Sequence, residues 1–158
     1  MFYRQEDNQD ADWHELDRGP GYFHVPPGCE VRIRMKGAND HELRILVEEL
    51  DGVTAITSLD LSENRKITDA GIVRLKSLLQ LRDLNLSSCD ITRITLDHLA
   101  ELPNLQSLNL SYCNRLDDSA VKSLNALSSL AYLNLQACMQ MTRAGVNRLQ
   151  RRGLEIHR

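Results

Sequence analysis

The stretch Ile56-Thr57-Ser58-Leu59-Asp60-Leu61, followed three residues later by Asn64, decides the fold of this 158-residue chain. It places aliphatic residues at its first, fourth and sixth positions, and the same pattern occurs three more times with Cys in place of Asn. The later copies run from Leu81 to Cys89, from Leu105 to Cys113 and from Leu130 to Cys138. The first residues of the four copies, from Ile56 onward and with Leu154 as a last member, follow one another at steps of 25, 24, 25 and 24 residues. A period this regular indicates a stack of repeated units.

Each unit predicts a β-strand followed by a helix, because the alternation of period two gives way to apolar residues at helical spacing. A residue suited to an N-cap precedes each helix, namely Thr68, Thr92, Asp117 and Thr142. The apolar residues that follow are Ile72, Leu75 and Leu78; Leu96, Leu99 and Leu102; Val121, Leu124 and Leu127; and Val146 and Leu149. Such units predict an α/β solenoid, a short horseshoe with a parallel sheet on its concave side and helices on its convex side.

Residues 56–150 resemble the cysteine-containing class of leucine-rich repeats, the kind found in F-box substrate receptors. The segment Leu108-Asn109-Leu110-Ser111-Tyr112-Cys113 carries this resemblance most clearly, and the segment from Ile67 to Gly71 is similar to bacterial repeats built on Ile-Thr-Asp-Ala-Gly. The resemblance implies a leucine-rich-repeat solenoid that binds proteins. For the F-box receptors it implies a substrate-recognition adaptor of a ubiquitin-ligase type complex, but residues 1–28 have no recognisable F-box pattern.

The repeat pattern divides the chain into four regions. They are residues 1–28, a non-repeat segment; 29–55, a degenerate first repeat; 56–153, four repeats; and 154–158, a terminal edge strand. We expect residues 1–28 to cap the open end of the core, with a disordered start over residues 1–12; a partner-binding arm is the alternative. The apolar residues expected in this cap include Trp13, Tyr22, Phe23 and Val25. Arg152 stands where earlier repeats have leucine and predicts the end of the stack.

Three of the four cysteines share one repeat position. Cys89, Cys113 and Cys138 should form a column about 5 Å apart, the spacing of adjacent strands, with Asn64 in the same column. Three thiols without a nearby histidine make a poor zinc site. We therefore interpret the column as small, buried groups with weak hydrogen-bonding ability, and expect neither a metal nor a cofactor. Free thiols in this number favour a reducing, cytoplasmic location.

Composition and charge exclude several kinds of partner. The chain is 42% hydrophobic and 26% charged, as expected of one soluble domain. Its net charge of -3 gives no reason to expect nucleic acid or an acidic membrane surface. No apolar stretch is long enough to span a bilayer, and the acidic N-terminus does not resemble a signal peptide. We expect neither nucleic acid nor a membrane as partner.

Catalytic patterns are equally scarce. The five histidines are scattered, and none belongs to a nucleophile or phosphate-binding motif, so we expect no enzyme. The two ends of the chain carry opposite charge. The C-terminal arginines are Arg143, Arg148, Arg151, Arg152 and Arg158, and the N-terminal acids are Glu6, Asp7, Asp10, Asp12, Glu15 and Asp17. We expect a monomer; weak head-to-tail association through these ends is the alternative.

The outward positions of the strands predict a binding face. Their three columns read Ser58, Asp83, Ser107, Tyr132; Asp60, Asn85, Asn109, Asn134; and Ser62, Ser87, Ser111, Gln136. Because hot spots of interfaces are enriched in Tyr and Arg, we predict that a partner protein binds this face or its borders. The candidate site residues are Arg82, Asp83, Asn85, Asn109, Tyr112, Tyr132 and Asn134. The alternative is that these polar residues only keep an exposed sheet soluble.

Overall fold

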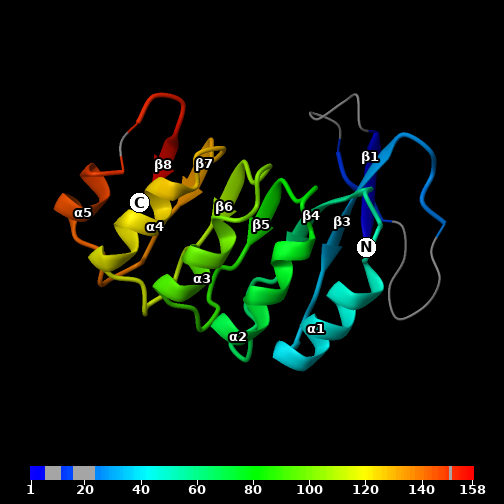
Figure 1. Ribbon diagram of the computed structural model, residues 1–158, viewed down its shortest axis with the longest axis horizontal. Coiled ribbons are helices and arrows are strands. Elements are labelled where there is room, and N and C mark those ends of the chain that lie inside the picture. Colours follow the sequence, from blue (N-terminus) through cyan, green and yellow to red (C-terminus); the bar gives the residue numbers. More distant parts are fainter. Residues whose placement is uncertain (6–11, 16–23, 150) are drawn as a thin grey trace.

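The computed structural model describes residues 1–5, 12–15, 24–149 and 151–158. Within these ranges the strands form one sheet in the order β2-β1-β3-β4-β5-β6-β7-β8. They are β1 (Phe2–Gln5), β2 (His14–Glu15), β3 (Cys29–Arg34), β4 (Ile56–Asp60), β5 (Asp83–Asn85), β6 (Ser107–Asn109), β7 (Tyr132–Asn134) and β8 (Glu155–His157). From β3 to β8 all neighbours are parallel, whereas β1 is antiparallel to both β2 and β3. The helices cover one face of the sheet, and the two termini lie at opposite ends (Figure 1).

The helices follow the predicted repeat. They are α1 (Asp40–Glu49), α2 (Asp69–Ile72), α3 (Arg93–Leu99), α4 (Val121–Ala126) and α5 (Arg143–Asn147), with 3-10 segments at Val73–Ser77 and Asp118–Ala120. Each of the four predicted N-cap side chains accepts a hydrogen bond from a backbone N–H of the turn that it begins, so these predictions are confirmed. The α/β repeat solenoid predicted from the sequence is confirmed as well.

The core is the continuous layer between the sheet and the helices. Leu59, Leu84, Leu108 and Leu133 lie side by side on successive strands, and each is at most 2% exposed. The first and sixth positions of each pattern are buried too, as Leu81 and Leu86 show. Because each leucine contacts leucines of the neighbouring repeats, truncation of one to alanine costs about 3 kcal/mol.

The cysteine column closes the turn that follows each strand. The thiols of Cys89, Cys113 and Cys138 donate to carbonyl oxygens of the preceding repeat over 3.1, 3.2 and 3.0 Å. Asn64 holds the same place and bonds Met35 and Leu61 through its amide nitrogen. Burial raises the pKa of both Cys89 and Cys113 to about 12. The interpretation of the column as buried hydrogen-bonding groups is therefore confirmed.

Aspartates that follow an N-cap residue link successive helix starts. Asp40 accepts hydrogen bonds from the amide and hydroxyl of Thr68 in the next repeat, over 2.8 and 2.6 Å. Asp69 and Asp118 bind Thr92 and Thr142 in the same way. Burial alone would raise the pKa of Asp69, but hydrogen bonds from Thr95 and Thr92 together hold it below its ordinary value.

A glycine makes room for this aspartate in two of the repeats. A Cβ added to Gly71 would lie 2.3 Å from Asp40 Oδ1, and one added to Gly145 would lie 2.1 Å from Asp118 Oδ1. Where Thr95 stands at the equivalent position, its hydroxyl donates to Asp69 over 2.6 Å instead. The glycine of the motif is thus a packing requirement between neighbouring repeats.

The N-terminal segment differs from the expected disordered start. Residues Phe2–Gln5 form β1 because Tyr3 packs against the core and Arg4 reaches a buried carboxylate of β3. The remainder of that prediction, residues 6–11, lies outside the described residues, as do Tyr22 and Phe23 of the expected cap.

Strand β8 lies at the C-terminal edge, parallel to β7. Arg151 donates to the backbone carbonyls of Asn125, Leu127 and Leu130 and so covers the end of the stack. The preceding core residue Leu149 is only 1% exposed. A side chain rather than another repeat therefore contacts these carbonyls, which lie at the end of α4 and in the segment that leads to β7.

Candidate functional site

A buried carboxylate organises the N-terminal part of the concave face, the sheet face opposite the helices. The Glu30 side chain, 3% exposed, accepts hydrogen bonds from Arg4 Nε at 3.2 Å and Nη2 at 3.1 Å. Arg82 Nη1 lies 2.5 Å from its other oxygen. Two arginines are what a buried carboxylate needs, because an unpaired charge there would be strongly destabilising. Arg82, a predicted binding residue, is therefore held by an internal ion pair.

Trp13 covers the neighbouring part of this face. The guanidinium carbons of Arg4 and Arg32 lie 4.5 and 4.3 Å from the centroid of its ring, within the range of a cation–π interaction. Arg32 Nε also donates to Ser58 Oγ over 3.0 Å. The prediction that Ser58 faces solvent is wrong, because under these side chains it is only 3% exposed.

Asp83 lies beside this cluster, in the row that continues through Ser107 to Tyr132. Burial raises the pKa of the Asp83 carboxyl above its ordinary value, while the charges of Arg32 and Arg4 oppose the rise. Desolvation also lowers the pKa of Arg32. The cluster of Arg and carboxylate groups is thus mutually compensating, which suits a structural role better than proton transfer.

The three predicted asparagines form a second row. Asn85, Asn109 and Asn134 are paired in register on β5, β6 and β7. The Oδ1 atom of each accepts the backbone N–H two residues further on, over 3.1, 3.0 and 2.9 Å. Each side chain therefore closes the turn after its strand and remains partly exposed. Among the described residues no partner is found for their amide nitrogens.

The two predicted tyrosines occupy different places. Tyr132 lies on the sheet, with its ring centroid 5.1 Å from that of His157, and His157 Nε2 lies 2.7 Å from Glu155 Oε1. Tyr112 lies on the turn after β6, with φ at 60°, and is 54% exposed. The structure thus brings Tyr132 and the asparagines together on one face and leaves Tyr112 at its border.

Sequence reasoning missed several residues of this face. With Leu154 as first residue, the asparagine column would continue to Arg158, but the structure pairs Asn134 with His157. The predicted register of the last strand is therefore wrong by one residue, which is why His157 was missed. Arg32 could have been found from the alternation in Val31-Arg32-Ile33. Trp13 was expected in the N-terminal cap but not on this face. No local signal pointed to Glu30, because its partners Arg4 and Arg82 lie far away in the sequence.

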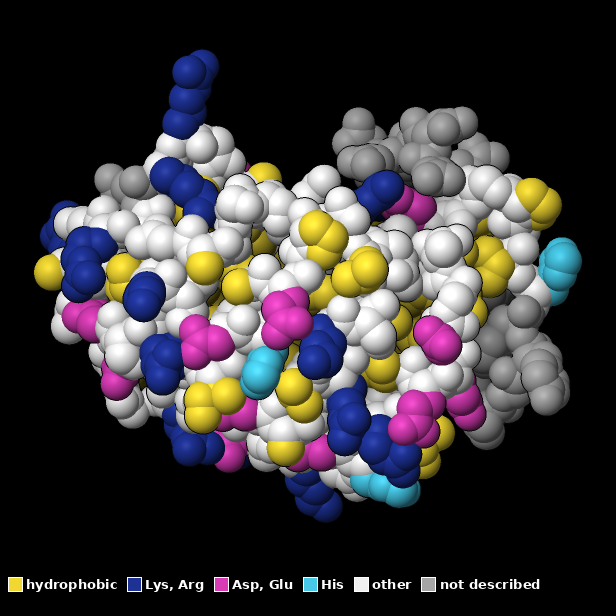
Figure 2. Space-filling view, in the orientation of Figure 1, with side chains coloured by type: hydrophobic (Ala, Val, Ile, Leu, Met, Phe, Trp, Pro, Cys, Tyr) yellow, Lys and Arg dark blue, Asp and Glu magenta, His cyan; other side chains and the backbone are white. Residues whose placement is uncertain are grey.

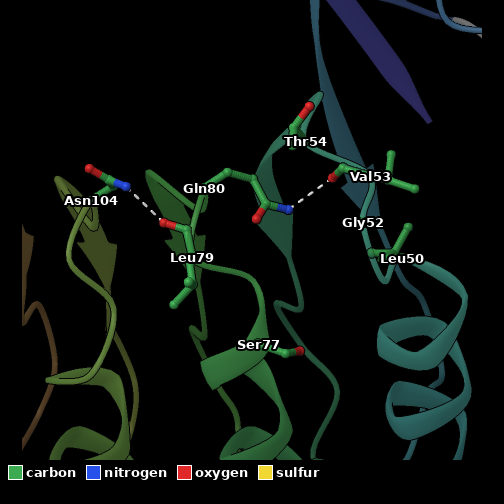
Figure 3. A pocket seen from close by; sticks show the side chains of 8 residues that line it. All are labelled: Leu50, Gly52, Val53, Thr54, Ser77, Leu79, Gln80 and Asn104. Carbon is green, nitrogen blue, oxygen red and sulfur yellow. Dashed lines mark hydrogen bonds between the residues drawn. The ribbon is translucent and has the colours of Figure 1, made fainter.

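Two hollows lie away from the concave face. One, of about 400 Å³, lies between the loops that lead from helix to strand, where Gln80 donates to Val53 O and Asn104 to Leu79 O (Figure 3). None of its lining residues is titratable: Leu50, Gly52, Val53, Thr54, Ser77, Leu79, Gln80 and Asn104. The second, of about 590 Å³, lies between α1 and the segment Val73–Ser77. Ser77 lines both hollows, and its hydroxyl donates to the backbone oxygen of Arg74 over 3.2 Å rather than to a side-chain base.

The described ranges contain no group of three or more His, Cys, Asp or Glu residues that could hold a metal ion. None of their helices has the length and apolar character required to cross a membrane. The concave face is therefore the surface that gathers most of the candidate residues.

Comparison with known proteins identifies the repeat. Residues 54–116 match the family described as Leucine rich repeat. The comparison with curated proteins gives no match. A chain in the crystal structure of the Rad7 and Elc1 complex in yeast is similar over 75% of this chain, at 22% identity and a TM-score of 0.64. This chain covers 29% of that one.

Leiomodin-1 Actin-Binding Site 2 is similar over 75% of this chain and 78% of its own, at 19% identity and a TM-score of 0.56. Likeness at this level of identity shows the fold alone. Together with the matched family and the parallel sheet flanked by helices, it shows that the fold is a leucine-rich-repeat solenoid.

Proposed function

We propose that this chain is a non-enzymatic, intracellular module that binds a partner protein on the concave face of its sheet. The observation that carries the proposal is the open row of side chains on β5 to β8. Asn85, Asn109, Asn134 and His157 lie in register there, with Tyr132 beside them, and all are at least partly exposed.

The N-terminal part of the same face is occupied by the chain itself. Trp13, Arg4 and Arg32 cover β3 and β4, so a partner has access mainly to the strands beyond them. The predicted site thus contracts to its C-terminal part, where Tyr132 offers the large amphipathic side chain that interfaces favour. The two similar structures, a complex of Rad7 with Elc1 and an actin-binding site of leiomodin-1, support protein binding as the class of function.

Association through charged ends has less support. Of the predicted acidic residues, Glu6, Asp7, Asp10 and Asp17 lie outside the described residues. At the other end, where Figure 2 shows Lys and Arg side chains gathered around α5, Arg151 and Arg158 donate to backbone carbonyls. The guanidinium groups of these two arginines are therefore engaged within the chain. The adaptor role in a ligase complex remains an alternative that rests on the resemblance alone.

The test compares two matched substitutions in capture from extract of the source cells. Tyr132→Arg places a charge on the concave face, and Ile94→Arg places the same charge on an exposed position of α3 on the opposite face. Both variants should retain the native circular dichroism spectrum. We expect Ile94→Arg to retain the proteins bound by the parent chain and Tyr132→Arg to lose them. The reverse pattern would move the binding surface to the helices.

A further inference from the structure

The orientation of the three asparagine side chains is fixed by the fold. A backbone N–H needs an acceptor, so the oxygen of each amide, and not its NH2 group, must face Ser87 N, Ser111 N or Gln136 N. The NH2 groups of Asn85, Asn109 and Asn134 are consequently left as donors. They form a row about 5 Å apart, the spacing of paired strands.

The fold itself does not require these NH2 groups. In the first repeat, Asp60 stands at the same position and its Oδ1 accepts Ser62 N over 3.0 Å. An oxygen alone therefore closes the turn. We call the NH2 groups of Asn85, Asn109 and Asn134 the donor row. The repeat fold does not need these groups to close its turns.

We propose that the donor row binds glutamate carboxylates spaced one turn apart along one face of a partner α-helix. This inference rests on the proposed concave binding surface. The helix lies across the strands, so that glutamates at positions i, i+3 or i+4, and i+7 each meet one asparagine. The NH2 groups donate, and the carboxylate oxygens accept.

Spacing selects a helix over an extended segment. Two strand intervals span about 9.6 Å, whereas residues i and i+7 of a helix are about 10.5 Å apart along its axis. Alternate residues of an extended chain lie about 6.7 Å apart, so two such steps span about 13.4 Å. The span of three glutamates on a helix therefore differs from the span of the three asparagines by about 1 Å, whereas that on an extended chain differs by nearly 4 Å.

Hydrogen-bond character selects carboxylates. The row presents donors only, and a bond from an amide to an ionised acceptor is stronger than one to a neutral acceptor. The face around the row is electrically balanced, since Arg82 pairs with Glu30 and Arg34 pairs with Asp60 at 3.2 Å. At the far border the Glu155 carboxylate lies within hydrogen-bond distance of His157 Nε2. A lysine side chain, which has no acceptor, could not use the row.

The test uses designed peptides and the full 15N-labelled chain. The first probe is an alanine-rich helical peptide of about 20 residues, long enough to form a helix, with glutamates at i, i+4 and i+7. The control peptide has the same composition with the glutamates on three different faces, and a third peptide has lysine in their place. We expect only the ordered glutamate peptide to shift the side-chain NH2 resonances of the three asparagines.

Substitution by Asp supplies the matched variant. Asn85→Asp, Asn109→Asp and Asn134→Asp together keep every acceptor of the turns, as Asp60 does, and replace the donors by carboxylate oxygens. Each lost bond to a carboxylate weakens binding about tenfold, and the triple variant should prefer the lysine peptide. If the triple variant fails to fold, the single variant Asn109→Asp serves instead. It should lose the NH2 resonance of residue 109 and bind the ordered glutamate peptide about tenfold more weakly.

Equal shifts with the control peptide, no shifts with the ordered peptide, or unchanged affinity after Asn→Asp would each overturn this inference. Its failure is separable from that of the proposed function. If Tyr132→Arg abolishes capture while the ordered peptide does not bind, the proposed concave binding surface is supported and the proposed glutamate-bearing helix is refuted.

Discussion

Gly71→Ala should destabilise the chain although alanine is the better helix former. The new Cβ would lie 2.3 Å from Asp40 Oδ1 and 3.2 Å from Asp40 Cα, so the carboxylate must move away. That movement breaks its hydrogen bonds to Thr68 N and Oγ1. Bonds to a partly exposed carboxylate are worth about 1.5 kcal/mol each. The helical preference of alanine over glycine returns about 0.8 kcal/mol, which leaves a net loss of about 2 kcal/mol.

The assay is urea unfolding of the parent chain, Gly71→Ala, Asp40→Ala and the double variant. The single glycine substitution should lower the free energy of unfolding in urea by about 2 kcal/mol. In the Asp40→Ala background the clash is gone, so Gly71→Ala should become neutral or stabilising by up to about 0.8 kcal/mol, which gives a coupling energy of about 2 to 3 kcal/mol. The same loss in both backgrounds would refute the reasoning. Gly145→Ala with Asp118→Ala repeats the test, and its coupling should have the same sign.

Three further predictions follow from buried groups. Cys113→Ala should cost about 1 to 2 kcal/mol and Cys113→Arg should unfold the chain in urea titrations, because the thiol is buried; tolerance of arginine would contradict its placement. Since the pKa values of Cys89 and Cys113 are raised from 9.0 to about 12 in the fold, stability should be full below pH 9 and fall as the pH rises towards 12. A thiol-reactive disulfide reagent should accordingly label them only on unfolding. Glu30→Ala removes the buried carboxylate that Arg4 and Arg82 share and should cost about 3 kcal/mol, with faster hydrogen exchange in β1; unchanged exchange would show that β1 is held by other contacts.

The repeat geometry could be predicted because it depends on neighbours in sequence. The N-caps and the leucine rows were predictable from spacing alone. The cysteine column was predictable because its repeat position allows a small donor such as Cys or Asn. In each case the residues of one repeat determine its local structure, and the other repeats form the same structure because they share the pattern.

Features formed between distant residues could not be predicted. Arg82 bonds Glu30 across 52 residues, and only the folded sheet brings them together. Strand β1 was missed because residues 1–12 are polar as a whole, which predicts disorder. The strand forms because it pairs with β3 and Tyr3 packs against the core. The structure places the three asparagines in register on one face, and their role in binding stays a prediction. Their use as turn acceptors follows from the folded geometry and not from the sequence pattern.

Binding of a partner on the concave face is the central claim, and site-specific photo-crosslinking tests it most directly. Tyr132 is replaced by benzoylphenylalanine in one variant and Ile94 in another, and both are irradiated in the source cells. We predict a protein adduct from position 132 that is absent at position 94. Adducts from position 94 without any from position 132 would contradict the claim.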